Sequence, residues 1–445
     1  MLSAFLNMFK IKELRSRILF TLGLVFICRL IVSVPLPGVS ASIIESWVTA
    51  SGGRTGDGLL GLMNLFSGGA MMKCSIGTLG IMPYISASII IQLMSGVIPY
   101  LEKLRREGDV GHQKITQYTR YLTVVICAVQ AGFMAVALST GNYWGLPANV
   151  VQVNPIGFFL LCIVSLVTGS LLLMWVGEQI TSRGIGNGIS LIITINIVSS
   201  LPNAVQLVFT QSTGEGALIG PFHIVFMLAL IFAVVLAVVA ITQAQQKVPV
   251  QFAKRMVGRK PMQGGTQHLP LRVNYSGVMP IIFGSVILQV IPAVARWMPW
   301  QGAKEWAQSF PLSNMYLFLF ALMILFFSYF WVATQFNPVQ IADDLKRRGG
   351  YVPGIRPGRP TADYLDRAMT RLTLAGAIFL AVIAILPNIM NKTFNVHWTI
   401  AEFFGGTSLL IIVGVMLDTM RQVESHLLMH HYDGFLKKGK MRGRR

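Results

Sequence analysis

The fold is decided by the stretch Gly58–Pro99, GLLGLMNLFSGGAMMKCSIGTLGIMPYISASIIIQLMSGVIP, which is too long for one membrane span and is interrupted where a span would be continuous. Its first part, Leu59–Met72, is apolar but shorter than the roughly 20 residues that a helix needs to cross a bilayer. After the Ser67-Gly68-Gly69 break, the second part, Ser75–Val97, is long enough to span. Non-helical backbone at membrane depth is tolerated only where protein buries it or where it lines a wet cavity. The sequence therefore predicts a half-helix that faces a cavity inside a helix bundle.

Composition indicates a membrane protein. A soluble chain carries about 25% charged residues, whereas these 445 residues are 12% charged and 53% hydrophobic. The net charge of +19 would suit a nucleic-acid partner, but the basic residues fall between the apolar segments, where they set membrane topology instead. The cysteines are far apart and lack metal-site spacing, so we predict neither a metal site nor a cofactor. They are Cys28, Cys74, Cys127 and Cys162.

Ten apolar segments are long enough to span a bilayer, which predicts an all-α polytopic membrane protein. They lie at about residues 18–35, 75–97, 121–140, 155–177, 188–209, 222–243, 276–295, 315–335, 372–389 and 401–420. Ten spans divide into five and five, and halves with an odd number of spans insert in opposite orientations, with the working site between them. We therefore expect an inverted repeat of residues 1–209 and 210–427, followed by a basic tail at 428–445.

Lysine and arginine are retained on the cytoplasmic side of a membrane, so their distribution predicts the topology. With both termini cytoplasmic, 30 of the 36 basic residues lie inside, five lie outside, and Arg29 falls within the first span. No small-residue cleavage site follows that span, so we expect it to remain in the protein.

Two cytoplasmic loops, 242–274 and 336–371, are longer and more basic than topology requires. One explanation is contact with anionic lipids, which contributes about 1 kcal/mol per basic residue near the surface. The alternative is a docking surface for a large cytoplasmic partner. The residues alone leave both interpretations open.

Ionisable groups at membrane depth, which a membrane enzyme or a proton-coupled transporter requires, are nearly absent. No metalloprotease, nucleophile-elbow or phosphate-loop motif occurs, so we expect no catalytic residue. The competing classes are a secondary transporter, which needs a midplane carboxylate or a substrate-binding cluster, and a membrane enzyme, which needs paired catalytic groups. Arg29 is the charge that lies well inside a span, and we expect it to snorkel or to pair with a backbone carbonyl.

Polar residues between and within the spans have a structural and a functional interpretation. The GIGNG run at 184–188 is similar to a nucleotide-binding loop, but it follows a helix instead of a strand, so a flexible break between spans is the simpler interpretation. Gln92 and Asn187 can join helices by hydrogen bonds or mark a seam that opens, and joining is the simpler interpretation.

Two pairs of isoleucines lie at helical spacing within predicted spans. Ile81 with Ile85, and Ile189 with Ile193, are i, i+4 pairs, so each pair faces one direction. Isoleucine is common in membrane helices, and spacing alone favours an ordinary core role.

A series of motifs resembles the SecY family, the central subunits of the bacterial protein-conducting channel. They are MNLFSGGAM (63–71), GIMPYISASIIIQL (80–93), YTRY (118–121), SLVTGSLLLMWVGEQIT (165–181), RGIGNGISLII (183–193), QHLPLRVNYSGVMP (267–280), VPGIRPG (352–358), TRLTLAGA (370–377) and FGGTSLLI (404–411). The resemblance is colinear from the first span to the last and covers about nine tenths of the chain.

The resemblance implies ten transmembrane helices in two inverted halves around a central pore, with a plug half-helix at about 59–72. It implies that unfolded secretory polypeptides cross through the pore and that transmembrane segments leave it sideways. The implied plug residues are Leu59, Leu60, Leu62, Met63, Leu65 and Phe66. The implied pore ring is Ile81, Ile85, Ile189, Ile193, Ile282 and Ile411, which reverses the core interpretation of the isoleucine pairs.

The resemblance also implies a lateral gate between the second and seventh spans, marked by Gln92 and Asn274. Lys254, Arg255 and Arg356 match basic positions that the motor SecA and the ribosome use in this family. Further implied partners are the subunits SecE and SecG, signal sequences, nascent polypeptides and membrane lipids, with no nucleic acid apart from that of the ribosome. The implied location is the bacterial cytoplasmic membrane.

The chain departs from the family pattern just after the sixth span. Thr242, Gln243, Gln245 and Gln246 stand where the family usually has a glutamate and several arginines. We therefore expect Arg356 and its neighbours to supply more of the electrostatic docking.

Overall fold

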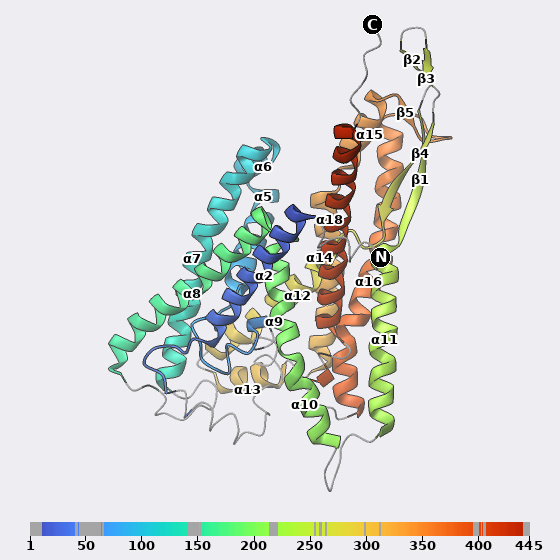
Figure 1. Ribbon diagram of the computed structural model, residues 1–445. Coiled ribbons are helices and arrows are strands. Elements are labelled where there is room, and N and C mark those ends of the chain that lie inside the picture. Colours follow the sequence, from blue (N-terminus) through green and yellow to red (C-terminus); the bar gives the residue numbers. More distant parts are fainter. Residues whose placement is uncertain are drawn as a thin grey trace. The chain divides into compact units, whose positions relative to one another are not determined.

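The computed structural model describes residues 11–40, 43, 64, 66–140, 151, 153–212, 221–252, 255–257, 260–262, 265–297, 300–310, 313–394, 400–401, 403 and 406–438. Most of them are helical, as predicted (Figure 1). The first part of the chain holds α2 (Lys12–Ser33), α5 (Met82–Val97), α6 (Pro99–Arg106), α7 (Asp109–Thr140), α8 (Pro155–Arg183), α9 (Gly188–Ser199), α10 (Leu201–Ser212) and α11 (Pro221–Gln243). The second part holds β1 (Gln245–Phe252), β2 (Arg255–Val257), β3 (Lys260–Met262), β4 (Thr266–Arg272), α12 (Met279–Trp297), α13 (Gln301–Ser309), α14 (Asn314–Gln335), α15 (Pro338–Arg347), β5 (Gly350–Tyr351), α16 (Arg359–Phe394) and α18 (Thr407–Lys438).

The chain forms two compact units. Unit 1 comprises Met1–Thr213, Trp398–Ile400 and Ile411–Arg445, and unit 2 comprises Gly214–His397 and Ala401–Leu410. Helix α18 therefore begins in unit 2 and continues in unit 1. The division into two units does not compare the structures of the two halves, so the inverted repeat of residues 1–209 and 210–427 stays a prediction.

Among the described residues, seven helices are long and apolar enough to cross a membrane, or eight if the bent pair α5 and α6 forms one span. The chain bends by 104° between the two helices of that pair, next to Pro99. The helix expected over 75–97 is shorter than predicted: it begins at Met82, because Pro83 favours a helix start and the residues before it form turns. The count of ten spans stays a prediction.

Helix α8 contacts α2, α7 and α9 within unit 1, and α7 lies along it (Figure 1). A Cβ atom on Gly169 would overlap the backbone of Ile76, and one on Gly188 would overlap the carbonyl of Gly177. Small residues permit this close approach of backbones in membrane bundles. The Thr181 hydroxyl accepts a hydrogen bond from the Gly188 N–H and donates one to the Gly177 carbonyl, both at 2.9 Å. Glycine is thus required where α8 meets its neighbours.

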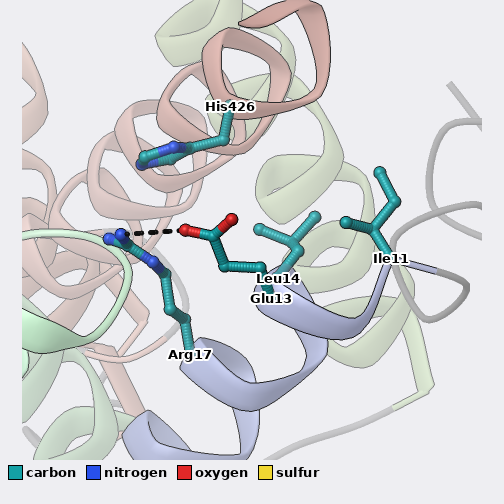
Figure 2. A pocket seen from close by; sticks show the side chains of 5 residues that line it. All are labelled: Ile11, Glu13, Leu14, Arg17 and His426. Atoms are coloured by element: carbon teal, nitrogen blue, oxygen red, sulfur yellow. Dashed lines mark hydrogen bonds and ion pairs between the residues drawn. The ribbon is translucent and has the colours of Figure 1, made fainter. Parts of the chain in front are cut away.

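The amino-terminal end of α2 packs against α18 within unit 1. Figure 2 shows Glu13 and Arg17 of α2 beside His426 of α18, with an ion pair of 3.4 Å between Arg17 Nη2 and Glu13 Oε1. A cluster of buried side chains continues this junction: Leu14, Ile185 and Val423. The junction attaches the last helix to unit 1.

In unit 2 the two long basic loops fold together into a sheet. Strand β1 pairs antiparallel with β4 and with β5, so the strand order is β4-β1-β5. Val248 and Val250 alternate inward along β1. They join a core of buried residues from both loops and the adjoining helices: Leu271, Val332, Phe336, Val352, Leu365 and Met369. These strands were not predicted, and the sheet makes the two loops one structural feature.

Candidate functional site

A short helical segment and a run of turns occupy the interrupted stretch. Asn64, Phe66 and Ser67 are helical, and turns lead from residue 68 to the start of α5. Gly68 and Gly69 have φ of +68° and +89°, a left-handed conformation that glycine adopts without steric cost. The predicted break is therefore confirmed. Five of the predicted plug residues lie outside the described part of the chain: Leu59, Leu60, Leu62, Met63 and Leu65.

Local hydrogen bonds hold these turns together. The carbonyl of Asn64 accepts from the Gly69 N–H at 2.9 Å, and its Oδ1 accepts from the Met72 N–H at 3.2 Å. The Ser67 hydroxyl donates to the Asn64 carbonyl at 3.1 Å and accepts from the Met71 N–H at 3.3 Å. A helix that ends leaves backbone groups unpaired, and these bonds satisfy several of them. The irregular backbone is thereby able to lie inside the protein.

Two side chains from other helices bind the end of this short helix. Arg29 of α2 donates from Nη2 to the Gly68 carbonyl and from Nη1 to Asn196 Oδ1, both at 3.3 Å. Asn196 of α9 donates from Nδ2 to the Phe66 carbonyl at 2.9 Å. The predicted pairing of Arg29 with a backbone carbonyl is confirmed. The role of Asn196, which is 2% exposed, was not predicted; its signal is a lone amide within the apolar run GISLIITINIV.

The six candidate pore isoleucines are divided between the two units. Unit 1 holds five of them and unit 2 holds Ile282 on α12. Five of the six are buried and Ile189 is half-buried; the buried ones are Ile81, Ile85, Ile193, Ile282 and Ile411. A ring that includes members of both units stays a prediction.

Two of these isoleucines meet over a glycine of α8. A Cβ atom on Gly177 would lie 3.4 Å from Ile189 Cγ1 and 3.6 Å from Ile81 Cδ1. Ile81, the residue before α5, thus presents its side chain to the same point on α8 as Ile189 and Ile192 of α9. The structure brings together residues from the two isoleucine pairs that the sequence singled out.

The two predicted lateral-gate residues belong to different units. Gln92 is an exposed residue of α5, and its carbonyl accepts from the Ser95 hydroxyl at 2.6 Å. Asn274 is half-buried in the turn before α12, and its Oδ1 accepts from the Ser276 hydroxyl at 3.4 Å. Their role as a gate stays a prediction.

The predicted basic docking residues that the structure describes lie in two places in unit 2: one is in the separate two-stranded sheet of β2 and β3, and the other follows the three-stranded sheet. Arg255 is the first residue of β2, and Lys254 lies outside the described residues. Arg356 is exposed in the turn between β5 and α16, and its carbonyl accepts from the Thr361 hydroxyl at 2.9 Å. The structure therefore presents Arg356 on a fixed turn.

An ion pair between α7 and α8 was not predicted. Arg120 Nε lies 2.9 Å from Glu178 Oε1, and Arg120 Nη2 lies 2.7 Å from Glu178 Oε2. The Arg120 side chain is 47% exposed and that of Glu178 is 19% exposed. This two-point geometry suits a guanidinium and a carboxylate and fixes the two helices against each other.

The GIGNG run forms a junction between helices. Asn187 Oδ1 accepts from the Ile189 and Ser190 N–H groups, so Asn187 caps α9. The Ile185 N–H donates to the Thr21 hydroxyl of α2 at 3.2 Å, and the Gly186 N–H donates to Gln422 Oε1 of α18 at 2.9 Å.

The described part of the chain contains no group of three or more histidine, cysteine, aspartate or glutamate residues that could hold a metal ion.

Comparisons with known proteins agree with this geometry. The family model for SecY matches residues 75–420. The protein translocase subunit SecY of Haemophilus influenzae is 42% identical over 436 residues, covering 97% of this chain and 96% of that protein. The SecY subunit of Vibrio cholerae is 42% identical over 444 residues, with the same shares covered.

Solved structures with a similar fold are protein channels. A structure described as that of a protein-conducting channel has a TM-score of 0.58 and 18% identity, covering 92% of this chain and 91% of that one. A second, described as showing that the plug domain of SecY stabilises the closed state and maintains a membrane seal, has a TM-score of 0.55 and 18% identity over the same shares. A third, Sec61 in the canine ribosome-channel complex from the endoplasmic reticulum, has a TM-score of 0.54 and 17% identity, again over 92% and 91%.

Proposed function

This chain belongs to the SecY family of protein translocase subunits, and on that premise we propose that it forms the pore through which unfolded secretory polypeptides cross the bacterial cytoplasmic membrane. The proposal rests on the run of turns from Gly68, which side chains of α2 and α9 hold and which ends at Ile81, the first candidate pore isoleucine. Irregular backbone at membrane depth is expected where it lines or closes a cavity.

The six isoleucines would form an apolar gasket. Branched apolar side chains surround an extended peptide of any sequence without specific bonds, and they expel water from an empty constriction, which resists the passage of ions. The meeting of Ile81 and Ile189 over Gly177 supports a constriction built on α5 and α9.

The half-helix that ends at Phe66 and Ser67 would act as the plug of the resting channel. A related channel of the same fold has a plug domain that stabilises the closed state. In this chain, the bonds from Arg29 and Asn196 to the end of the half-helix support a defined closed position.

Transmembrane segments would leave the pore sideways between α5, which contains Gln92, and α12, which follows Asn274. SecE and SecG are the companion subunits that the family membership suggests, and SecA or a ribosome would dock on the basic sheet of unit 2. A channel of this fold has been solved in complex with a ribosome.

Both termini would be cytoplasmic, because 30 of the 36 basic residues then lie inside.

Transport in a reconstituted system tests this function. Vesicles that contain the chain with SecE and SecG, together with SecA and ATP, are expected to take up a secretory chain into a protease-protected space. A substrate with one apolar segment is expected to remain in the membrane after alkaline extraction, because it leaves sideways into lipid.

A secondary transporter is the competing class. If the assembled complex protects neither substrate, the channel function is contradicted, and small-solute uptake by the same vesicles becomes the next measurement.

A further inference from the structure

The Arg29 guanidinium has an unusual set of partners for a charge within a span. Placing an arginine at the centre of a membrane helix costs about 3 kcal/mol, so such residues face the protein interior and bond there. Among the described residues, no carboxylate forms an ion pair with Arg29. Its guanidinium donates hydrogen bonds to the Gly68 carbonyl and to Asn196 Oδ1. The cost of the charge is thus offset by binding the end of the half-helix.

The carbonyls of Phe66 and Gly68 are suited to this contact. The last carbonyls of a helix lack partners in the helix and carry partial negative charge, which a cation nearby stabilises. Asn196 binds the first of these carbonyls and Arg29 binds the second, while the two side chains also bind each other. Residues of two helices therefore hold one short segment at two adjacent points.

We propose that Arg29 and Asn196 are positioning residues that act together to fix the carboxyl-terminal end of the plug in its closed position. The inference rests on the proposed function, in which the half-helix closes the pore. A guanidinium fits this task because its planar fork reaches two acceptors at once. Asn196 fits because its amide accepts from Arg29 at one atom and donates to the plug at the other.

Gly68 is part of the same arrangement. A Cβ atom at this position would lie 2.5 Å from Arg29 Nη1 and 2.8 Å from Asn196 Oδ1. Its φ of +68° also disfavours any other residue. The glycine lets both side chains approach the backbone.

Hydrogen exchange tests the proposal on the whole channel complex in lipid nanodiscs. Arg29→Gln and Asn196→Ala are each expected to accelerate exchange at the Gly69, Met71 and Met72 amides by about tenfold or more, the effect of losing a hydrogen bond to a charged group. The double variant is expected to exchange no faster than the faster single variant, because either change alone breaks the shared arrangement.

Two matched variants serve as controls. Arg17→Gln removes a cation from the same helix, where it pairs with Glu13. Thr194→Ala removes a buried polar group of α9 that bonds within its own helix, to the Ser190 carbonyl. Both are expected to leave exchange at the plug unchanged.

The outcomes separate the inference from the function on which it rests. Unchanged exchange in Arg29→Gln and Asn196→Ala would overturn the positioning role, and so would equal acceleration throughout α7 and α8, which would indicate general destabilisation. Faster local exchange with unchanged ion conductance of the resting channel would keep the positioning role but contradict the closing function of the plug. Faster local exchange with raised conductance is the result expected.

Discussion

Replacing Ile193 and Ile282 together by glycine is expected to raise the ion conductance of the resting channel in planar bilayers. Both side chains are buried, at 4% and 5% exposure, on helices α9 and α12. Each substitution removes an apolar side chain whose burial contributes about 1.5 to 3 kcal/mol of free energy. Water and ions should therefore enter the constriction at least about tenfold more often for each side chain lost. The gasket is the physical basis of the expected increase.

A neighbouring pair of isoleucines provides the control. Ile192 and Ile281 lie on the same two helices and are 1% and 2% exposed, so glycine at both removes the same volume and the same helix propensity. Each lies one residue before a candidate pore position, so its side chain is turned by about 100° around the helix from that position. Equal leakage from this control, or unchanged conductance in the Ile193 and Ile282 variant, would argue that the plug alone seals the channel.

Arg356→Glu is expected to lower motor-driven export by about tenfold or more, because a like charge placed against a docking partner costs several kcal/mol. The turn that carries Arg356 is well fixed. Val352 is buried in the core beneath the sheet, the Ile355 N–H donates to the Val352 carbonyl at 3.1 Å, and Thr361 binds the Arg356 carbonyl. The loss should therefore come from the reversed charge, with the fold intact.

Arg367→Glu makes the same change of charge on an exposed residue of α16, whose Nε donates to the Asp363 carbonyl at 3.2 Å. ATP-driven import into vesicles is measured for both variants at low and high salt. Near-normal import by the Arg356 variant, or an equal defect in both, would contradict docking at this turn.

The main features of the membrane fold were predictable because hydrophobic length and charge asymmetry are local signals. The break at Ser67-Gly68-Gly69 was also predictable, since glycine and serine interrupt an apolar run. The helix boundary at Met82 was missed, because residues 75–81 are as apolar as the helix that follows and only their turns distinguish them. The sheet was missed although KVPVQF alternates every second residue, because the pairing depends on residues outside this run. Gln251 pairs with Thr266 later in the same loop and with Tyr351 in the second loop.

The candidate site was predictable in part. Arg29 was noticed because a charge inside a span is costly, and pairing with a carbonyl is one of the few solutions. The sequence could not identify Gly68 as the acceptor or Asn196 as the second bonding residue, since these contacts join residues that are 39 and 167 positions from Arg29. The isoleucines of the candidate pore ring were predicted through the family resemblance, because their spacing alone is ordinary.

Site-specific photocrosslinking to a stalled secretory chain tests whether polypeptide passes through the middle of this protein. Probes at Ile81, Ile193 and Ile282 are expected to crosslink to the chain, whereas a probe at Phe232, a 67% exposed residue of the apolar helix α11, is not. Crosslinks from the three pore positions alone would establish the path. An assembled, stalled complex that gives no crosslink from any of them would contradict the channel account and favour the transporter class.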